Sequence, residues 1–157
     1  MLLNLLILYT FIENLSTNWY NVCRFFTLIE IKEGFMKELK VLAINGSPHG
    51  EGGTFQAINI VAKELEKQGI KTEILQIGNK AIRGCQGCGT CKKGSTNGLC
   101  VFNDDEVNIA IEKMKSCDGL ILGSPVYYAG VNGTMKSFLD RFFYAGASSL
   151  RHKVATS

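Results

Sequence analysis

The sequence predicts an α/β fold in which a doubly wound parallel sheet carries helices on both faces. Three features of the sequence point to it. Short, nearly continuous apolar segments alternate with amphipathic segments whose apolar residues recur every three or four positions. The amphipathic segments are long enough to be the crossover helices that parallel strands require. Loops of unusual composition follow the predicted strands, at the edge where such sheets bind ligands.

The composition is that of one globular domain. The chain has 157 residues, of which 46% are hydrophobic and 20% charged, and its formal net charge is +3. These values exclude disordered, collagenous and coiled-coil proteins, and no basic run indicates a nucleic-acid partner. The longest apolar stretch, 2–12, is interrupted twice by polar residues and is shorter than the ~20 residues of a membrane span. We therefore expect a cytoplasmic protein without nucleic-acid or membrane partners.

Residues 1–35 do not share the pattern of the remaining chain. They lack the basic start and the small-residue cleavage site of a signal peptide, and the basic face of an interfacial anchor. Lys32-Glu33-Gly34 can be encoded by a purine run of the ribosome-binding type, just upstream of Met36. We hypothesise that translation starts at Met36 and that 1–35 is a mis-assigned leader, with an apolar leader or anchor as the alternative. N-terminal sequencing of the native protein tests this hypothesis.

The first part of the domain reads as a strand, a loop, a helix and a second strand. The apolar run 39–44 is typical of a strand buried on both faces. A glycine-rich loop, 45–54, follows it. Gly69 suits the C′ position that ends the helix, and 70–77 is the second strand. The helix is predicted from an apolar stripe formed by Phe55, Ile58, Ala62 and Leu65.

The second part repeats the alternation. Asn103 or Asp104 is predicted to cap a second helix. A short apolar strand at 120–123, a loop at 124–132, a third helix and the first residues of a fourth strand at 154–156 follow. The second helix is predicted from Val107, Ala110, Ile111 and Met114, and the third from Met135, Phe138, Leu139 and Phe142.

The loop between the first strand and the first helix has the features of a phosphate-binding turn. Backbone N–H groups and the helix dipole favour an anion at this place, and glycines let the backbone approach it closely. Ser47 and Thr54 add hydroxyl donors. Neither a P-loop nor a Gly-x-Gly-x-x-Gly motif is present. An ordinary surface turn with Thr54 as helix N-cap, and an exposed His49 without a role, are the alternatives.

The loop at 123–130 offers walls for a flat ligand. Tyr127 and Tyr128 stand between a proline and a glycine, and aromatic side chains with backbone amides suit a heteroaromatic ring. The alternative is a packed loop whose tyrosines cover the core. The cysteine-rich segment also follows a strand, so we expect all three loops to meet at one edge of the sheet.

Four of the six cysteines are concentrated in one segment, with spacings of two, two and eight residues. Five glycines in this segment let the chain wrap tightly, and two-residue spacings let thiolates reach different corners of a 4Fe-4S cluster. A zinc site, thiol–disulfide chemistry and cysteines that bind no metal are the alternatives. Cys117 is expected to be a buried, small apolar residue. The predicted metal ligands are Cys85, Cys88, Cys91 and Cys100.

From Met36 onward the chain resembles the NAD(P)H-dependent FMN reductase family of flavodoxin-like proteins, specifically its iron–sulfur flavoprotein branch. The motifs that carry the resemblance are Asn45-Gly46-Ser47-Pro48 with Gly52-Gly53-Thr54, the cysteine segment, Ser124-Pro125-Val126-Tyr127-Tyr128, and Lys136 with Phe138-Leu139-Asp140-Arg141.

The resemblance implies FMN, with its phosphate in the loop 47–54 and its isoalloxazine ring against 125–128. His49 and Gly53 depart from the basic residue and the asparagine that are usual in the family. The expected FMN-binding residues are Ser47, Pro48, His49, Gly52, Gly53, Thr54, Ser124, Pro125, Val126, Tyr127, Tyr128 and Gly130. The resemblance also implies five strands, so the chain is expected to be truncated after the third helix, without the C-terminal strands.

These observations predict an FMN-dependent oxidoreductase that moves electrons between a donor such as NAD(P)H, a 4Fe-4S cluster and FMN. No catalytic side chain is assigned, because this chemistry belongs to the cofactors. The expected partner is a small-molecule acceptor or a redox protein, and a homo-oligomer is implied by the resemblance alone. The alternatives are a flavodoxin-like carrier without its own substrate, and an FMN reductase whose cysteines bind zinc or no metal.

Overall fold

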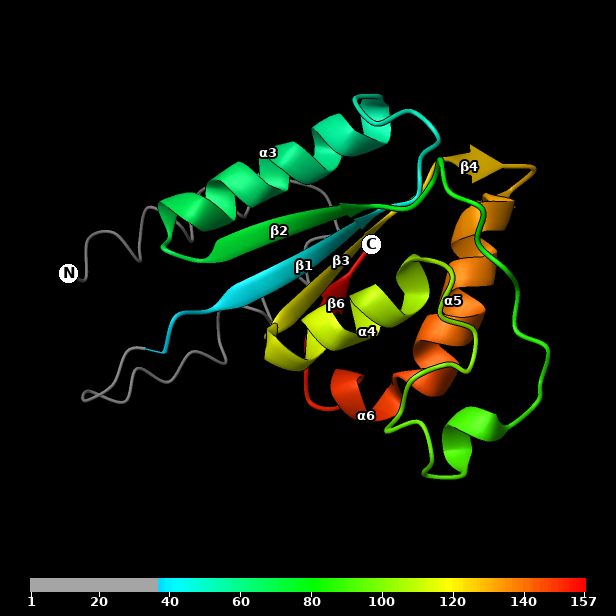
Figure 1. Ribbon diagram of the computed structural model, residues 1–157. Helices are drawn as coiled ribbons and strands as arrows, with labels where there is room; N and C mark the ends of the chain where they lie inside the picture. Colours follow the sequence, from blue (N-terminus) through cyan, green and yellow to red (C-terminus); the bar gives the residue numbers. More distant parts are fainter. Residues whose placement is uncertain (1–36) are drawn as a thin grey trace. The chain divides into compact units, whose positions relative to one another are not determined.

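The computed structural model describes residues 37–157 (Figure 1). The predictions for 1–35 and Cys23 lie outside this range. The elements, labelled as in Figure 1, are β1 (Lys40–Asn45), α3 (Gly53–Lys67), β2 (Lys71–Gln76), the 3₁₀ turn η1 (Thr90–Lys92), α4 (Glu106–Ser116), β3 (Gly119–Gly123), β4 (Val126–Tyr127), β5 (Gly130–Val131), α5 (Gly133–Ala145), α6 (Ala147–Leu150) and β6 (Val154–Thr156).

The central sheet confirms the predicted fold class. Its strand order is β2-β1-β3-β6, and β1 pairs in parallel with both β2 and β3. In the register, Val41 lies opposite Thr72 on one side and Gly119 on the other. An order of 2-1-3-4 is that of the flavodoxin-like doubly wound fold. The predicted start of a fourth strand is also confirmed, since β6 follows α5 and α6.

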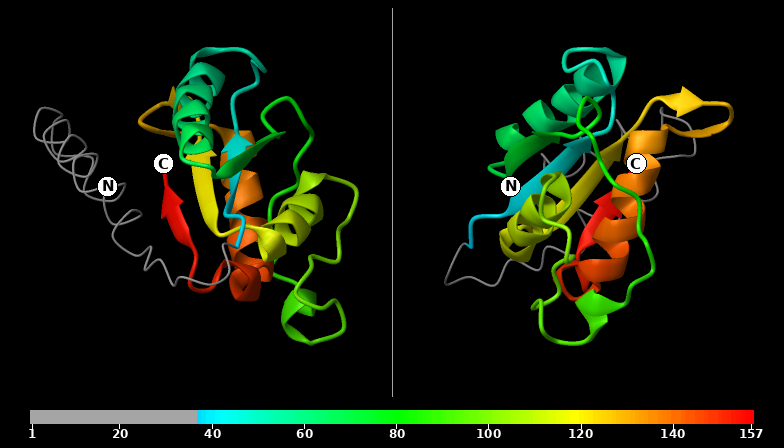
Figure 2. Two further views of the ribbon diagram at one scale, coloured as in Figure 1. Left: turned by 90° about the vertical axis from the view of Figure 1, so that its left-hand side faces the viewer. Right: turned by 45° about the vertical axis from the view of Figure 1, so that its right-hand side comes forward.

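Helices cover both faces of the sheet (Figures 1 and 2). Leu42 and Ile44 of β1 belong to the core that α4 and α5 complete on one face. Because side chains alternate along a strand, Val41 and Ala43 point to the other face, where α3 lies. Every residue from Val41 to Asn45 is therefore buried, which explains the nearly continuous apolar run. The predicted stripe of α3 buries Ile58, Ala62 and Leu65.

The two helices on the second face bury the residues that the sequence pattern predicted, except that Leu139 of α5 is only half-buried. The stripe Val107, Ala110, Ile111 and Met114 is fully buried. The N-cap of α4 is Asp105, not Asn103 or Asp104, because its Oδ1 accepts the N–H of Val107 at 3.2 Å. Asn132 caps α5 by accepting the N–H of Met135 at 2.9 Å. Within 37–157, no helix is both long and apolar enough to cross a bilayer.

Residues 124–132 are more ordered than the predicted loop. They contain the antiparallel strands β4 and β5, with Val126 opposite Val131 and Tyr127 opposite Gly130. The two-residue turn between them places Tyr128 and Ala129 at φ values of 48° and 63°. Such a turn normally takes asparagine or glycine. This hairpin escaped prediction because tyrosine and alanine are not the residues that signal it.

Asp118 gives the fold a pH-dependent contact. Its carboxylate pairs with Lys37 Nζ at 2.5 Å and accepts the N–H of Lys40 at 3.1 Å. Partial burial opposes the charged form, but these two partners outweigh it and lower the pKa of Asp118 from its ordinary 3.8. The resulting stability is present above the unfolded pKa and is lost as the pH falls through the lowered pKa of the folded state.

We expect Asp118→Asn to lower the free energy of unfolding by up to about 1 kcal/mol at pH 7. Thermal melts of the full chain from pH 7 down to pH 2 measure the effect. The difference between the variant and the wild type should close as the pH falls below about 4. A difference in stability between variant and wild type that stays constant from pH 7 to pH 2 would contradict this role of the Asp118 carboxylate.

Candidate functional site

The predicted phosphate loop lies between the carboxyl end of β1 and the first turn of α3. Ser47 is buried, whereas Pro48, His49 and Gly50 are exposed. The N-cap of α3 is Gly52, which has no side chain to satisfy the first N–H groups of the helix. Thr54 is the second residue of α3 and not its cap, so the alternative with a Thr54 cap is wrong. Amide donors at the start of α3 are therefore not occupied by a capping side chain.

A polar network beneath the loop holds its backbone in place. Asn45 Oδ1 accepts the N–H of Ser47 at 3.1 Å, and Gln76 Nε2 donates to the Ser47 carbonyl at 2.7 Å. Asn45 Nδ2 donates to Gln76 Oε1 at 2.5 Å, so the last residues of β1 and β2 act together. Ser47 Oγ accepts the N–H of His49 at 3.1 Å. Its own O–H remains available to donate to an anion.

The hairpin loop lies beside the phosphate loop. Gly46 donates its N–H to the Gly123 carbonyl at 2.7 Å, and Asn132 Nδ2 donates to the Gly46 carbonyl at 2.6 Å. The hydroxyl of Ser124 donates to the Pro125 carbonyl at 2.9 Å and accepts the N–H of Asn132 at 3.2 Å. Ser124 thus shapes the start of the hairpin. The predicted juxtaposition of these two loops is present in the structure.

The apolar side chains of the hairpin point away from the core. Tyr127 is 49% exposed, Val126 is 75% exposed and Tyr128 is fully exposed. The alternative in which the tyrosines cover the core is therefore wrong. Exposed aromatic and apolar groups next to a set of free amides suit a flat ring that carries a phosphate.

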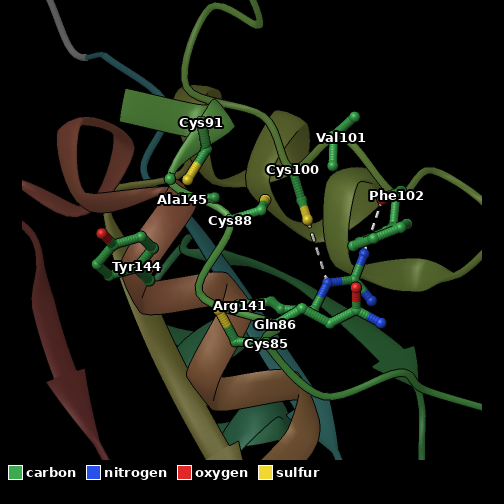
Figure 3. Close-up of a pocket in the computed structure, with 11 residues that line it drawn as sticks. Cys85, Gln86, Cys88, Cys91, Cys100, Val101, Phe102, Arg141, Tyr144 and Ala145 are labelled. Carbon is green, nitrogen blue, oxygen red and sulfur yellow. Dashed lines mark hydrogen bonds between the residues drawn. The ribbon is translucent and has the colours of Figure 1, made fainter. Parts of the chain in front are cut away.

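The four cysteines of the cysteine segment line one cavity (Figure 3). Cys85 and Cys88 are exposed, Cys91 and Cys100 are half-buried, and all four are free thiols. Gly87, Gly89, Gly94 and Gly98 have φ values between 66° and 79°, a region that favours glycine. The predicted tight wrapping is thus observed. The remaining lining residues are Gln86, Gly89, Val101, Phe102, Arg141, Tyr144 and Ala145.

The cysteine cavity does not lie at the edge where the other two loops meet, contrary to expectation. After β2 the chain runs alongside α5 to η1, near α6 (Figures 1 and 2). The cavity contacts α5 between Arg141 and Ala145, whereas the phosphate loop contacts Asn132 at the start of that helix. These positions are separated by roughly 14–20 Å along the helix axis. The extended segment after β2 carries the thiols away from the strand end.

The donor set of the cavity has the chemistry of a thiolate-bound centre. Cys85 Sγ accepts the N–H of Gly87 at 3.5 Å, and Cys100 Sγ accepts Nε–H of Arg141 at 3.3 Å. Among residues 37–157, no three histidine, cysteine or acidic side chains are arranged to hold a single metal ion. A 4Fe-4S cluster offers four separate corners and takes its thiolates farther apart than one ion does. Four free thiols, two of which accept an N–H donor at sulfur, fit such a cluster.

Two thiols have perturbed acidities. The hydroxyl and the backbone N–H of Thr90 lower the pKa of Cys88, which favours the thiolate that metals bind. Burial raises the pKa of Cys117, and this residue is 5% exposed. The prediction that Cys117 is a buried, small apolar residue is confirmed.

Sequence reasoning assigned no role to Arg141, which is 1% exposed and lines the cavity. Burial disfavours its charged form, but hydrogen bonds to Asp105 and Cys100 outweigh this effect and raise the pKa of Arg141. One signal in the sequence marks this residue. Arg141 follows Phe138 by three positions and precedes Phe142 and Ala145, so an arginine occupies the apolar stripe of its helix.

The fold and its two carboxyl-edge loops define a flavodoxin-like protein. A family model described as NADPH-dependent FMN reductase matches residues 39–157. The chain therefore belongs to the NADPH-dependent FMN reductase family, and the resemblance noted in the sequence is confirmed.

Individual relatives agree with this membership. An iron-sulfur flavoprotein of Methanocaldococcus jannaschii is 40% identical over 103 residues, which cover 66% of this chain and 51% of the relative. An iron-sulfur flavoprotein of Archaeoglobus fulgidus is 34% identical over 118 residues, which cover 74% of this chain and 56% of the relative. The chain spans about half the length of these curated relatives.

Solved structures support the fold. An NAD(P)H:quinone oxidoreductase from Methanothermobacter marburgensis matches with a TM-score of 0.55 at 15% identity, over 70% of this chain and 55% of that one. An apo NADH:FMN oxidoreductase matches with a TM-score of 0.50 at 22% identity, over 74% of this chain and 55% of that one.

Proposed function

We propose that this chain is the FMN-binding part of a flavin-dependent oxidoreductase of the iron–sulfur flavoprotein type. Electrons move between a donor, a 4Fe-4S cluster and FMN. The observation that carries the proposal is the cavity lined by four free thiols on a chain of the FMN reductase family. The curated relatives named iron-sulfur flavoproteins support the same reading.

The FMN phosphate is proposed to bind at the start of α3. The free amides after Gly52, the hydroxyl of Ser47 and the helix dipole supply the donors that a phosphate needs. The open space around Gly53 leaves room for such a ligand. His49 lies in the exposed part of this loop and Thr54 in the first turn of the helix. The isoalloxazine ring is proposed to lie against the hairpin, between Pro125 and Tyr128.

Cys85, Cys88, Cys91 and Cys100 are proposed to hold the cluster. A flavin exchanges one or two electrons and a 4Fe-4S cluster exchanges one, so together they join a two-electron donor such as NAD(P)H to a one-electron acceptor. The protein supplies binding and orientation, together with N–H donors to the thiolate sulfurs. The proposed acceptor is a small molecule or a redox protein.

An absorption spectrum of the full chain purified without oxygen tests the proposal. We expect a flavin spectrum on top of a broad sulfur-to-iron absorption that dithionite bleaches, with about four iron atoms per polypeptide. Oxidation of NAD(P)H, with and without a small quinone, then separates an enzyme from a carrier. Flavin without iron would reject the cluster but keep the flavin site, and a protein that binds no flavin would overturn the proposal.

A further inference from the structure

Arg141 is a buried charge that needs partners. It projects from the apolar stripe of α5 and is 1% exposed. Burying an unpaired guanidinium is costly, so a buried arginine is expected to be paired and hydrogen-bonded. Its charge partner is Asp105, whose side chain is 3% exposed and accepts from Nη1 of Arg141. The same carboxylate caps α4, so the pair joins the two helices.

The other donors of the guanidinium reach both ends of the cysteine segment, and Figure 3 shows those to Cys100 and Phe102. Nη1 donates to the Arg83 carbonyl at 3.1 Å, just before the first cysteine. Nη2 donates to the Phe102 carbonyl at 2.7 Å, just after the last one. Nε donates to Cys100 Sγ at 3.3 Å. A single planar side chain thus closes the base of the segment and directs one N–H at a thiol.

Cys100 is held by its backbone as well as its sulfur. Asn108 of α4 accepts the N–H of Cys100 at 2.8 Å and donates to its carbonyl at 2.8 Å. The other three thiols belong to the looped part of the segment, and Cys85 and Cys88 are exposed. Cys100 is therefore fixed from two helices before any ligand binds. The eight-residue gap before it does not weaken it as a ligand, because its position does not depend on the loop.

On the basis of the proposed function, we propose that Arg141 is a positioning residue that presents Cys100 to the cluster and raises the cluster's reduction potential. A one-electron reduction makes the cluster and its thiolates more negative. An N–H donor and a nearby positive charge stabilise that reduced form more than the oxidised form. Asp105 offsets part of this effect, because its negative charge lies beside the guanidinium.

Redox titration of the purified holoprotein, followed by electron paramagnetic resonance, tests this role. We expect Arg141→Gln to shift the one-electron equilibrium about tenfold toward the oxidised cluster, which is a potential lower by about 59 mV. Iron per polypeptide should also fall, because Cys100 loses the donor that orients it. A thermal melt of the same variant separately reports the loss of the buried ion pair.

Arg83→Gln is the matched control. Arg83 stacks on the Phe102 ring, 4.5 Å from its centroid, and its guanidinium is an exposed charge that pairs with Asp104 at 3.7 Å. Its side chain donates to no sulfur among the hydrogen bonds of residues 37–157. Water screens this charge, so the potential should stay at the wild-type value. An equal shift of the reduction potential in Arg141→Gln and Arg83→Gln would show that the loss of any nearby positive charge has this effect. That result would overturn the proposal.

Asp105→Asn supplies a test of opposite sign. Asparagine keeps the shape and can still cap α4, but it removes the negative charge that offsets Arg141. The potential should therefore rise. If Arg141→Gln gives no folded protein, this rise decides in favour of the proposal and an unchanged potential decides against it. A wild-type protein without iron would reject the proposed function, whereas a cluster whose potential is the same in the variants would reject the role of Arg141 alone.

Discussion

Replacing Gly78 by alanine is expected to weaken FMN binding about 10- to 100-fold. Gly78 is buried where the chain leaves β2, and it donates its N–H to the Asn45 carbonyl at 3.2 Å. A Cβ at this position would overlap the carbonyl oxygens of Ser47 and Gly46, which are backbone atoms. Relief requires the phosphate loop to move, and such overpacking costs about 1–3 kcal/mol or more. Titration of the flavin-free chain with FMN, followed by flavin fluorescence, measures the loss.

Gly50→Ala is the control in the same loop. A Cβ on Gly50 would meet no atom within 4 Å, and the residue is not in the left-handed region. We expect its affinity for FMN to remain within about twofold of the wild-type value. Wild-type affinity in Gly78→Ala would show that the loop position does not govern flavin binding. An equal loss of FMN affinity in Gly78→Ala and Gly50→Ala would show that any substitution in or beside the loop weakens binding, whether or not the added Cβ overlaps the backbone.

Replacing Cys88 by serine is expected to remove the cluster and leave the flavin. Cys88 is exposed and its thiolate is favoured by Thr90, so the substitution alters a proposed metal ligand without disturbing the core. The flavin loops lie at the other end of α5 and do not depend on this thiol. Iron analysis and the absorption spectrum of anaerobically purified protein should show flavin with most of the iron and the sulfur-to-iron band lost.

Cys117→Ala is the control for Cys88→Ser, because it removes a thiol that lies outside the cysteine cavity. Cys117 belongs to the core and lines no part of the cysteine cavity. Removing its sulfur is expected to cost about 1 kcal/mol of stability and to leave the iron content unchanged. Full retention of iron by Cys88→Ser would contradict the ligand assignment. Loss of zinc in place of iron would identify the zinc alternative.

Local periodicity was sufficient to predict most of the architecture. The apolar run of β1 and the apolar stripes of α3 and α4 predict which residues are buried, because residues on one face of a strand or helix recur at a fixed spacing along the chain. The parallel pairing of β1 with β2 and β3 follows from the crossover helices between them. The gathering of Cys85, Cys88 and Cys91 follows from their two-residue spacings and from the glycines between them, whereas contacts with α4 and α5 place Cys100.

Side-chain contacts and turn geometry were harder to predict from the sequence. Three neighbouring polar residues are candidates to cap α4, and the one that does so, Asp105, also pairs with the buried Arg141. The hairpin of β4 and β5 turns through Tyr128 and Ala129, whose identities do not indicate positive φ. The local sequence pattern indicates neither the position of this cap nor the turn of this hairpin.

By itself, the sequence determined the strands of the central sheet, the three long helices, the family and the four clustered cysteines, because local spacing or residue type indicates each of them. Only the tertiary structure decided that the cysteine cavity lies along the second half of α5, away from the phosphate loop. It alone brings Arg141 to Cys100, although 41 positions separate them in the chain. Long-range pairing of this kind depends on how α4 and α5 pack on the sheet, and no periodic signal in the sequence carries that information.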